Sequence, residues 1–473
     1  MGERMKKYFS IILGPTLFFV CLLLIPESVL PFAVKGTLGL FLWMASWWIT
    51  MPIAVAVTAF LPIIVNAIFG FVPMDGIIAK YASDLVFMLL GANIITLTWE
   101  ATGLNERVAL SILSTIGPSV KTQVTVWFLI AVVMSMFLPN VVIAATLTPI
   151  ALAMLQSVGK GDVKNNLCAT NLLLAVGWGA GLGGFGSPLG GGMNLVSIGY
   201  IEEMTGVEYM YIDWVWRMMP FLIFLTIGCL LYIRRMKTDA DSLPGAKEYF
   251  IQKLKERGPM VKNEKMAAVL FVVPVILAFG RPLYQSMVPS LTSSYVFIVC
   301  ALFAFLLPGG IDGKMLTWKY AQPKLSWGLF YTLAGGLALG AFITASGASA
   351  MVADMVLNLG ISPGVLLLVV FVSLAAFLAS VSSNNAACAI AIPIVITITQ
   401  ALGVNSLGYI YVASVGGNLA YTLPTATLAV PVANGVPIKY MMKHGLVLTI
   451  IAVAITSLIG IVCVQYWPYF TTM

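Results

Sequence analysis

The residues of this sequence best suited to binding a small ion are asparagines, serines and threonines set into apolar segments. Asn140 lies in the run 138–141 (LPNV), and Asn384 lies in the run 382–385 (SSNN). An asparagine side chain presents a carbonyl oxygen to a cation and an amide donor to a carboxylate or sulfate. These two runs therefore predict a site that holds an anion and a small cation without a charged side chain.

Two further apolar segments are interrupted by residues that do not continue a helix. One is the glycine-rich run 181–194, and the other is the run 422–431, which contains Thr427 and two prolines. A broken helix exposes N–H groups that suit an anion and carbonyl groups that suit Na⁺. Taken singly, each break also fits a structural role, because glycine allows close helix approach and proline bends helices. Together, the four polar breaks favour a transport site.

The elements that must carry these breaks are transmembrane helices. Of the 473 residues, 60% are hydrophobic and 9% are charged, whereas a soluble domain carries about 25% charged residues. Apolar runs long enough to cross about 30 Å of hydrocarbon recur throughout the sequence, and the short alternating pattern of a membrane barrel does not. The sequence predicts an all-α polytopic membrane protein.

Apolar segments between charged flanks predict about eleven crossings. The predicted crossings are 8–26, 35–50, 53–71, 82–104, 165–200, 212–233, 266–282, 291–308, 326–357, 407–436 and 445–466. Two segments do not fit as crossings, because the two flanks of each belong on one side: basic flanks enclose 122–157, and neutral flanks enclose 361–402. We expect two re-entrant hairpins, one entering from each side, with the asparagines at their tips.

Charge sets the expected orientation in the cytoplasmic membrane. The segment 234–265 carries nine lysines and arginines against five acids, which places it in the cytoplasm with a surface helix over 247–257. Lys160 with Lys164, and Lys439 with Lys443, mark further cytoplasmic connections. The connection that contains Glu202, Glu203, Glu208 and Asp213 has no basic residue and is expected outside. The N-terminus is then cytoplasmic and the C-terminus external.

Landmarks in the two halves share an offset of 244 residues. The pairs are Gly91 with Gly335, Gly103 with Gly347, Asn140 with Asn384 and Pro149 with Pro393. The two hairpins are expected to enter the membrane from opposite sides, and they are separated by the same offset as the other landmarks. This pattern predicts an inverted-topology repeat. The chain then divides into an N-terminal helix (1–34), a first repeat (35–233), a cytoplasmic linker (234–265) and a second repeat (266–473). The first repeat comprises scaffold helices 35–104, the hairpin 122–157 and the broken helix 165–200, and the second comprises scaffold helices, the hairpin 361–402 and the broken helix 407–436.

Other classes of function find no support in the sequence. The net charge of +7 comes from basic residues at helix ends and loops, as expected of a membrane protein and not of a nucleic-acid partner. Six scattered cysteines and the single His444 offer no metal-ligand spacing. An enzyme site would need clustered acids, a histidine pair or an activated nucleophile. Asp84, Glu100 and Arg107 lie near the ends of the crossing 82–104, where we expect helix-end anchoring or mutual pairing.

The segments 47–62 and 91–104, with the two tips, resemble the divalent anion–sodium symporter family, which carries dicarboxylates, citrate and sulfate. The resemblance covers nearly the whole chain. It implies a scaffold domain that mediates homodimerisation and a transport domain that moves as an elevator. It also implies substrate carboxylates held at both hairpin tips and flanked by two Na⁺ sites, with no cofactor apart from Na⁺ as coupling ion.

The resemblance assigns roles to individual residues. It implies that the substrate is bound by Asn140, Val141, Gly191, Ser383, Asn384, Asn385 and Thr427. The implied ligands of the first sodium ion are Ser135, Asn140 and Gly190. The implied ligands of the second are Ser382, Asn384 and Ala426.

The chain departs from the family pattern at the same places. The Ser-Asn-Thr motif of the family is replaced by PNV at 139–141 and by SNN at 383–385, and its Thr-Pro motifs are replaced by Gly191-Gly192 and Thr427-Leu428. Pro139 has no backbone donor and Val141 has no hydroxyl, so the first tip offers fewer hydrogen bonds to an anion. Because such bonds discriminate strongly between ligands, we expect the departure to alter the substrate.

These observations predict Na⁺-coupled symport of a small, dicarboxylate-like dianion. The alternative is a proton-coupled exchanger or an inorganic-anion exporter of the same superfamily. Proton coupling would require an essential buried carboxylate, and Asp84 and Glu100 are the best candidates for it.

Overall fold

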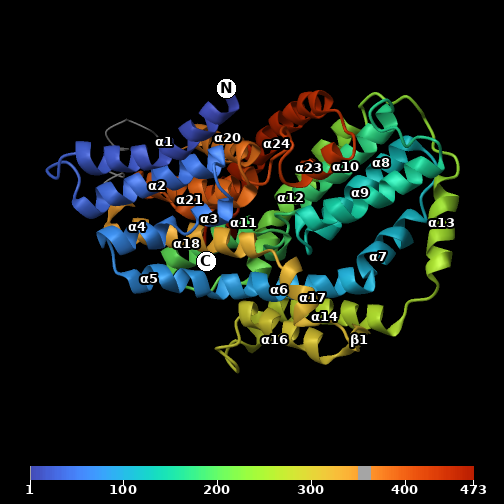
Figure 1. Cartoon of the computed structure of the whole chain (residues 1–473), viewed down its shortest axis with the longest axis horizontal. Coiled ribbons are helices and arrows are strands. Elements are labelled where there is room, and N and C mark those ends of the chain that lie inside the picture. Colours follow the sequence, from blue (N-terminus) through green and yellow to red (C-terminus); the bar gives the residue numbers. More distant parts are fainter. Residues whose placement is uncertain (1, 350–363) are drawn as a thin grey trace.

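The computed structural model describes residues 2–349 and 364–473, and these residues are almost entirely helical (Figure 1). Seven helical stretches in this part of the chain are long and apolar enough to cross a membrane. They are Phe32–Thr50, Met74–Thr102, Asn140–Ser157, Tyr211–Ile233, Trp327–Ser346, Asn384–Ala401 and Ile438–Tyr466. With the shorter apolar helices between them, these stretches make a multi-pass membrane protein.

The first group of helices precedes the first hairpin. It comprises α1 (Gly2–Leu24), α2 (Phe32–Thr50), α3 (Val55–Thr58), α4 (Leu61–Phe69), α5 (Met74–Ala79), η1 (Lys80–Ala82), α6 (Asp84–Thr102) and α7 (Leu104–Leu113). The predicted crossing 53–71 is interrupted between α3 and α4, where the Tyr81 hydroxyl donates a hydrogen bond to the Ala59 carbonyl. Helix α7 was not predicted, because its polar residues read as a connection.

The predicted hairpin 122–157 consists of two antiparallel helices joined by four residues. Its arms are α8 (Val120–Ser135) and α9 (Asn140–Ser157). The predicted broken helix 165–200 follows as α10 (Leu167–Gly183), a 3₁₀ turn η2 (Pro188–Gly190) and α11 (Gly192–Thr205). Helix α12 (Tyr211–Ile233) matches the predicted crossing 212–233.

The linker and the helices after it run from residue 246 to residue 346. They are α13 (Ala246–Arg257), α14 (Lys262–Phe279), α15 (Arg281–Tyr284), α16 (Ser293–Leu306), the short strand β1 (Pro308–Ile311), α17 (Trp318–Ala321), η3 (Gln322–Lys324) and α18 (Trp327–Ser346). Helix α13 confirms the predicted linker helix 247–257. Part of the predicted crossing 326–357 lies outside the described residues.

The second hairpin and second broken helix complete the chain. They are α20 (Val365–Val381), α21 (Asn384–Ala401), α22 (Ser406–Gly416), η4 (Ala426–Leu428), α23 (Ala429–Ala433), α24 (Ile438–Tyr466) and η5 (Pro468–Phe470). The start of the predicted hairpin at 361 lies outside the described residues. The helix that carries the predicted crossing 445–466 begins earlier, at Ile438, so Lys439 and Lys443 lie inside α24 and not in a connection. Both lysines are exposed at the end of that helix, where long side chains extend toward water.

The landmark pairs at the 244-residue offset occupy equivalent structural positions. Helices α9 and α21 begin and end at residues related by this offset, and each contains the paired proline. Gly103 and Gly347 end α6 and α18 in the left-handed conformation, with φ of 72° and 75°. This conformation is favourable for glycine and strained for other residues.

Each hairpin packs along its broken helix through a glycine. If Gly179 of α10 carried a side chain, its Cβ atom would lie only 2.5 Å from the Phe128 carbonyl oxygen of α8, closer than a real Cβ can approach. A Cβ on Gly416 of α22 would lie 2.8 Å from the Val372 carbonyl oxygen of α20. Phe128 and Val372 are again separated by 244 residues. Glycine allows each broken helix to lie directly on the backbone of its hairpin.

The linker helix α13 is fixed to the junction of α6 and α7 by an ion-pair network. Arg257 donates to the Gly103 carbonyl at 2.7 Å and pairs with Glu106 at 2.7 Å and with Glu264 at 3.3 Å. Arg107 also pairs with the buried Glu264, at 2.8 Å. Because Glu264 is 2% exposed, removing either arginine would weaken the pairing of a buried charge.

Close helix packing at Gly91 gives a stability prediction. A Cβ at Gly91 of α6 would lie 2.6 Å from the Phe297 carbonyl carbon of α16. We expect Gly91→Ala to destabilise the fold by about 1–3 kcal/mol, the usual cost of overpacking, and to lower the midpoint of thermal unfolding in detergent. Gly328→Ala is the control, because its Cβ would lie 3.6 Å from the nearest atom, Ala56 Cβ. Equal midpoints for the two variants would contradict the packing described for α6.

Candidate functional site

The first hairpin tip places Ser135 and Asn140 at facing helix ends. Ser135 ends α8 and is fully buried, and its hydroxyl donates to the Ala180 carbonyl of α10 at 2.6 Å. Asn140 begins α9 directly after Pro139 and is 9% exposed. Its Oδ1 accepts a hydrogen bond from the Val141 N–H at 2.9 Å. The Val141 side chain itself is 44% exposed, so this side of the tip is open.

Backbone carbonyl groups of the first break converge beside this tip. A Cβ on Gly190 would lie 2.2 Å from the Gly184 carbonyl oxygen and 2.7 Å from the Ser135 carbonyl oxygen. A Cβ on Gly184 would lie 3.3 Å from Asn140 Nδ2. The structure therefore brings together Ser135, Asn140 and Gly190, the three predicted ligands of the first sodium ion. Oxygen atoms of this kind are what a small hard cation requires.

The second hairpin tip presents two amide oxygens without a hydrogen-bond partner. The Ser383 hydroxyl caps α21 by accepting from the Ala386 N–H at 3.3 Å, and the Ser382 hydroxyl donates to the Leu378 carbonyl at 2.7 Å. The Oδ1 atoms of Asn384 and Asn385 are buried, and neither has a partner among the described residues. A buried polar atom without a partner costs about 1–3 kcal/mol. The tip is therefore suited to a ligand that supplies the missing interaction.

The first break also lies beside the second tip and the second break. A Cβ on Gly192, where α11 begins, would lie 3.0 Å from Asn385 Oδ1 of the second tip. A Cβ on Gly181 of α10 would lie 3.2 Å from Thr427 Oγ1 of the second break. Gly191, which precedes α11, has an extended backbone and lies against Met193. Segments far apart in sequence thus gather their polar groups at the middle of the molecule.

The residues predicted for the second sodium ion are not gathered in the same way. Ser382 and Asn384 are neighbours at the second tip. Ala426 begins η4, which packs mainly against α9, α10 and α23. This structure thus places η4 beside the first hairpin.

Two asparagines of the site, Asn418 and Asn194, were not among the predicted site residues. Asn418 is 1% exposed, donates to the Ser414 carbonyl at 3.0 Å, and leaves its Oδ1 unpaired among the described residues. That oxygen lies 3.4 Å from the position of a Cβ on Gly184. Asn194 donates to the Gly184 carbonyl at 2.7 Å and also leaves its Oδ1 unpaired. The signal that could have found both is an asparagine in an otherwise apolar segment.

The carboxylates considered for proton coupling are not buried. Asp84 and Glu100 are both exposed. Asp84 accepts from the Tyr295 hydroxyl at 2.7 Å, and Glu100 pairs with Lys324. Arg107 lies in α7 and pairs with Glu264. Of the two expected alternatives, the structure shows helix-end positions for Asp84 and Glu100, and the three residues do not pair with one another.

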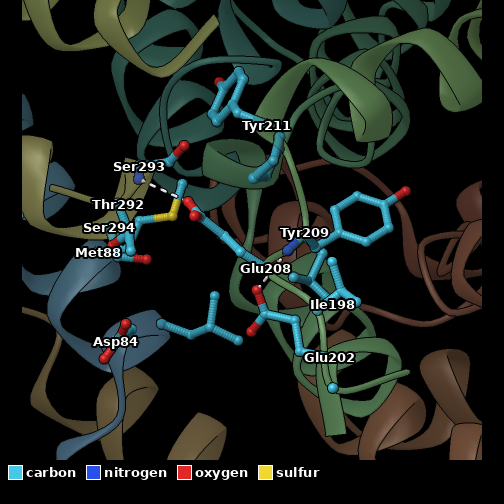
Figure 2. Close-up of a pocket in the computed structure, with 14 residues that line it drawn as sticks. Asp84, Met88, Ile198, Glu202, Glu208, Tyr209, Tyr211, Thr292, Ser293 and Ser294 are labelled. Atoms are coloured by element: carbon cyan, nitrogen blue, oxygen red, sulfur yellow. Dashed lines mark hydrogen bonds between the residues drawn. The ribbon is translucent and has the colours of Figure 1, made fainter. Parts of the chain in front are cut away.

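A separate acidic cavity of about 300 Å³ lies between α6, α11 and α16 (Figure 2). Glu202, at the end of α11, accepts from the Tyr209 N–H at 2.9 Å. Glu208 accepts from the Ser293 N–H at 3.4 Å and pairs with Arg281 at 3.0 Å. Asp84 lies on the α6 side of the cavity. No group of three metal-binding side chains close enough to share an ion occurs in the described part of the chain, so this cavity is not assigned as a cation site.

Comparison with known families identifies the architecture. The model of the sodium:sulfate symporter transmembrane region matches residues 6–473. The chain belongs to this family of membrane transporters. It is 29% identical to the sodium-dependent dicarboxylate transporter SdcS of Staphylococcus saprophyticus, over 95% of this chain and 90% of that relative. It is 30% identical to SdcS of Staphylococcus aureus, over 97% of this chain and 92% of that relative.

Solved structures with a similar fold are also transporters. The YdaH transporter of Alcanivorax borkumensis superposes with a TM-score of 0.56 and 15% identity, over 83% of this chain and 88% of the other. The antimetabolite efflux pump MtrF of Neisseria gonorrhoeae superposes with a TM-score of 0.52 and 13% identity, over 81% and 82%. At these identities the likeness concerns the fold alone. The symporter family thus shares its helical arrangement with more distant carriers.

The acidic cavity generates a prediction about pH. Glu202 lies beyond residue 200, where the predicted span ends. Burial raises the pKa of its carboxyl group from 4.5 to about 7. The Tyr209 N–H and Lys80 oppose this rise, whereas Asp84 and Glu208 add to it. The folded protein then holds this proton at pH values where the unfolded chain has released it. The contribution of Glu202 to stability is therefore present below about pH 4.5 and is lost as pH rises through about 7.

We expect the unfolding midpoint to fall between pH 5 and pH 8 by less in Glu202→Gln than in the wild-type protein. Glu203→Gln, which removes a neighbouring carboxylate paired with Lys80, should retain the wild-type contribution of Glu202. The measurement is thermal unfolding in detergent across this pH range. An unchanged pH dependence in Glu202→Gln would show that this carboxyl does not titrate as described.

Proposed function

We propose that this protein couples the uptake of a small, dicarboxylate-like dianion to Na⁺. The observation that carries the proposal is the convergence of amide groups from both hairpin tips and both helix breaks. Four buried amide oxygens remain without partners among the described residues: Asn194, Asn384, Asn385 and Asn418. Because these oxygen atoms can only accept, they suit a site completed by a cation, and the anion would be bound by N–H and hydroxyl donors.

Helix N-termini provide the anion half of the proposed site. Helix α9 begins at Asn140, α21 at Asn384 and α11 at Gly192. The first N–H groups of a helix have no partner within it and carry partial positive charge. A dianion with two separated carboxylates can use one hairpin tip with each carboxylate. Ser383, Asn385 and Thr427 then bind the substrate, with Val141 and Gly191 forming apolar and backbone contacts.

Backbone and amide oxygens provide the cation half. The first proposed Na⁺ site comprises the Ser135 and Gly184 carbonyl groups beside Gly190, with Asn140 as a further ligand. The second comprises Ser382, Asn384 and the backbone at Ala426. In this structure η4 packs on α9 and α10. To complete the second site, η4 would have to move closer to the second hairpin tip. Binding of the ion would then order the second break.

Burial favours Na⁺ over a proton as the coupling ion. Asp84 and Glu100 are exposed. Glu264 is the fully buried carboxylate among the residues whose side chains the structure describes, and it pairs with Arg107 and Arg257. Glu202, which is partly buried and has a raised pKa, lines the separate acidic cavity and was not among the residues brought together at the hairpin tips. A carboxylate held by two arginines is stabilised in its charged form. It is therefore poorly suited to release and regain a proton during transport.

The similarity to the SdcS proteins, whose name describes a sodium-dependent dicarboxylate transporter, supports the same assignment. We infer that the two repeats are inverted and that the hairpins and broken helices move as an elevator against the remaining helices. The same inference places the linker 234–265 and the N-terminus in the cytoplasm, the C-terminus outside, and a homodimer interface on the scaffold. If more than two Na⁺ accompany a dianion, each net charge gains about 2.3 kcal/mol per 100 mV.

Uptake into proteoliposomes tests the proposed function. Purified protein is reconstituted, and entry of radiolabelled succinate, citrate and sulfate is followed with an inward Na⁺ gradient, an inward K⁺ gradient or an inward proton gradient. We expect at least one dianion to accumulate only with the Na⁺ gradient. Asn384→Ala should abolish that accumulation. Uptake driven equally by K⁺, or by protons without Na⁺, would contradict the proposal.

Asn418 gives a second test, because its unpaired Oδ1 is proposed to interact with the bound ion directly or through the first break. We expect Asn418→Ala to raise the half-saturating Na⁺ concentration for uptake about tenfold or more, equivalent to about 1.4 kcal/mol. Asn434→Ala is the matched control, since Asn434 also donates to the carbonyl four residues earlier, at 2.8 Å. Similar Na⁺ dependence in both variants would exclude Asn418 from the site.

The valine at the first tip gives a third test. Val141→Thr restores a hydroxyl at a 44% exposed position, and one added hydrogen bond is worth about 0.5–1.5 kcal/mol. We expect the KM for the transported dianion to fall about two- to tenfold. Val133→Thr, at a 55% exposed position on α8, should leave KM unchanged. No change in KM for any dianion in Val141→Thr would place the substrate away from this tip.

A further inference from the structure

A basic cavity lies at one end of the paired helices α12 and α24. These helices run antiparallel: Gly228 faces Ile455 in the middle, and Arg217 donates to the Tyr469 carbonyl at 3.1 Å at one end. At the other end, the Tyr232 hydroxyl and His444 Nδ1 form a hydrogen bond of 2.7 Å. A cavity of about 310 Å³ opens beside this last contact. The cavity therefore lies at the opposite end of α12 and α24 from the contacts of Arg217.

The cavity concentrates positive charge without a carboxylate. Arg235, Lys237 and Lys443 line it together with His444 and the phenol groups of Tyr232 and Tyr440. No acidic residue is among its lining residues, and none of the three permanent cations forms an ion pair within the described residues. Lys160, which does not line the cavity, differs from these three by pairing with Asp239 at 3.6 Å. Three like charges around one cavity repel one another unless an anion neutralises them.

Apolar side chains are exposed on both helices beyond the cavity, and those of α24 line a separate groove against α20 (Val365–Val381). Leu231 and Ile227 of α12 are 51% and 49% exposed, and Leu446 and Ile450 of α24 are 54% and 61% exposed. On a membrane protein such a surface contacts acyl chains. Tyrosine and lysine residues at helix ends lie at the level of lipid headgroups. These residue types place the cavity at headgroup level, with exposed apolar side chains further along the same two helices.

We propose that this cavity binds the phosphate group of an anionic phospholipid. Arg235, Lys237 and Lys443 would neutralise the phosphate, and the acyl chains would lie along the exposed apolar side chains of α12 and α24. Basic pockets between transmembrane helices are suited to such headgroups. A free phosphate ion shares the headgroup chemistry but makes no use of the exposed apolar side chains. The proposal does not depend on the transported substrate or on its coupling ion.

Lipid-dependent thermal stability tests the proposal on the full-length protein. Purified wild-type protein is mixed with detergent micelles that contain phosphatidylglycerol or phosphatidylcholine, and the unfolding midpoint is recorded. A third sample contains phosphatidylcholine and 10 mM inorganic phosphate. We expect phosphatidylglycerol alone to raise the midpoint above the phosphatidylcholine value. An equal rise with inorganic phosphate would overturn the assignment to a lipid.

Variants distinguish this cavity from general attraction between a basic protein and anionic lipid. We expect Arg235→Gln/Lys443→Gln to lose more than half of the phosphatidylglycerol-dependent rise. Lys262→Gln/Lys265→Gln removes two exposed cations that do not line the cavity, and it should retain the rise. If the first double variant does not remain folded, the single exposed change Arg235→Gln is measured in the same way. Equal loss in the cavity variant and the control, or no loss in either, would overturn the proposed site.

Discussion

A polar backbone group inside a membrane must find a partner within the protein, and this requirement governs the centre of the molecule. The first break leaves the helical hydrogen-bond pattern between Gly184 and Gly191. Its carbonyl groups are satisfied by side chains: Asn194 donates to Gly184 and Ser187, and Trp214 donates to Phe185. The break is therefore a defined structure that can hold an ion. What remains unpaired is a small set of amide oxygens, and these define the proposed site.

Close packing at glycine makes this enclosure possible. The broken helices α10 and α22 lie on the backbones of the hairpin arms α8 and α20, with Phe128 and Val372 in equivalent positions. Larger residues would separate the hairpins from the breaks and would move the tips away from Gly184 and Gly192. The site therefore depends on helix packing along its whole length as well as on the polar residues at its centre.

The sequence predicted the parts of the site that interrupt a regular pattern. The first residues of α9 and α21 were predicted as hairpin tips, because a polar run stands out within an apolar segment. Asn418 was missed because a single asparagine between apolar residues has no motif, and its importance arises only from its distance to Gly184. The start of α24 was misplaced because exposed lysines within a helix end have the same composition as a connection. The position of η4 depends on tertiary packing, which residue spacing does not report.

The central claim is that the two hairpin tips and two helix breaks form one site for an anion and Na⁺. The measurement that tests it most directly is an electron cryo-microscopy reconstruction of the protein in lipid nanodiscs with Na⁺ and the transported dianion, compared with one in K⁺. In the Na⁺ sample alone, we expect anion density between Asn140 and Asn384 and cation density beside Gly190. Anion density elsewhere, for example in the cavity lined by Glu202 and Glu208, or equal density in K⁺, would contradict this claim.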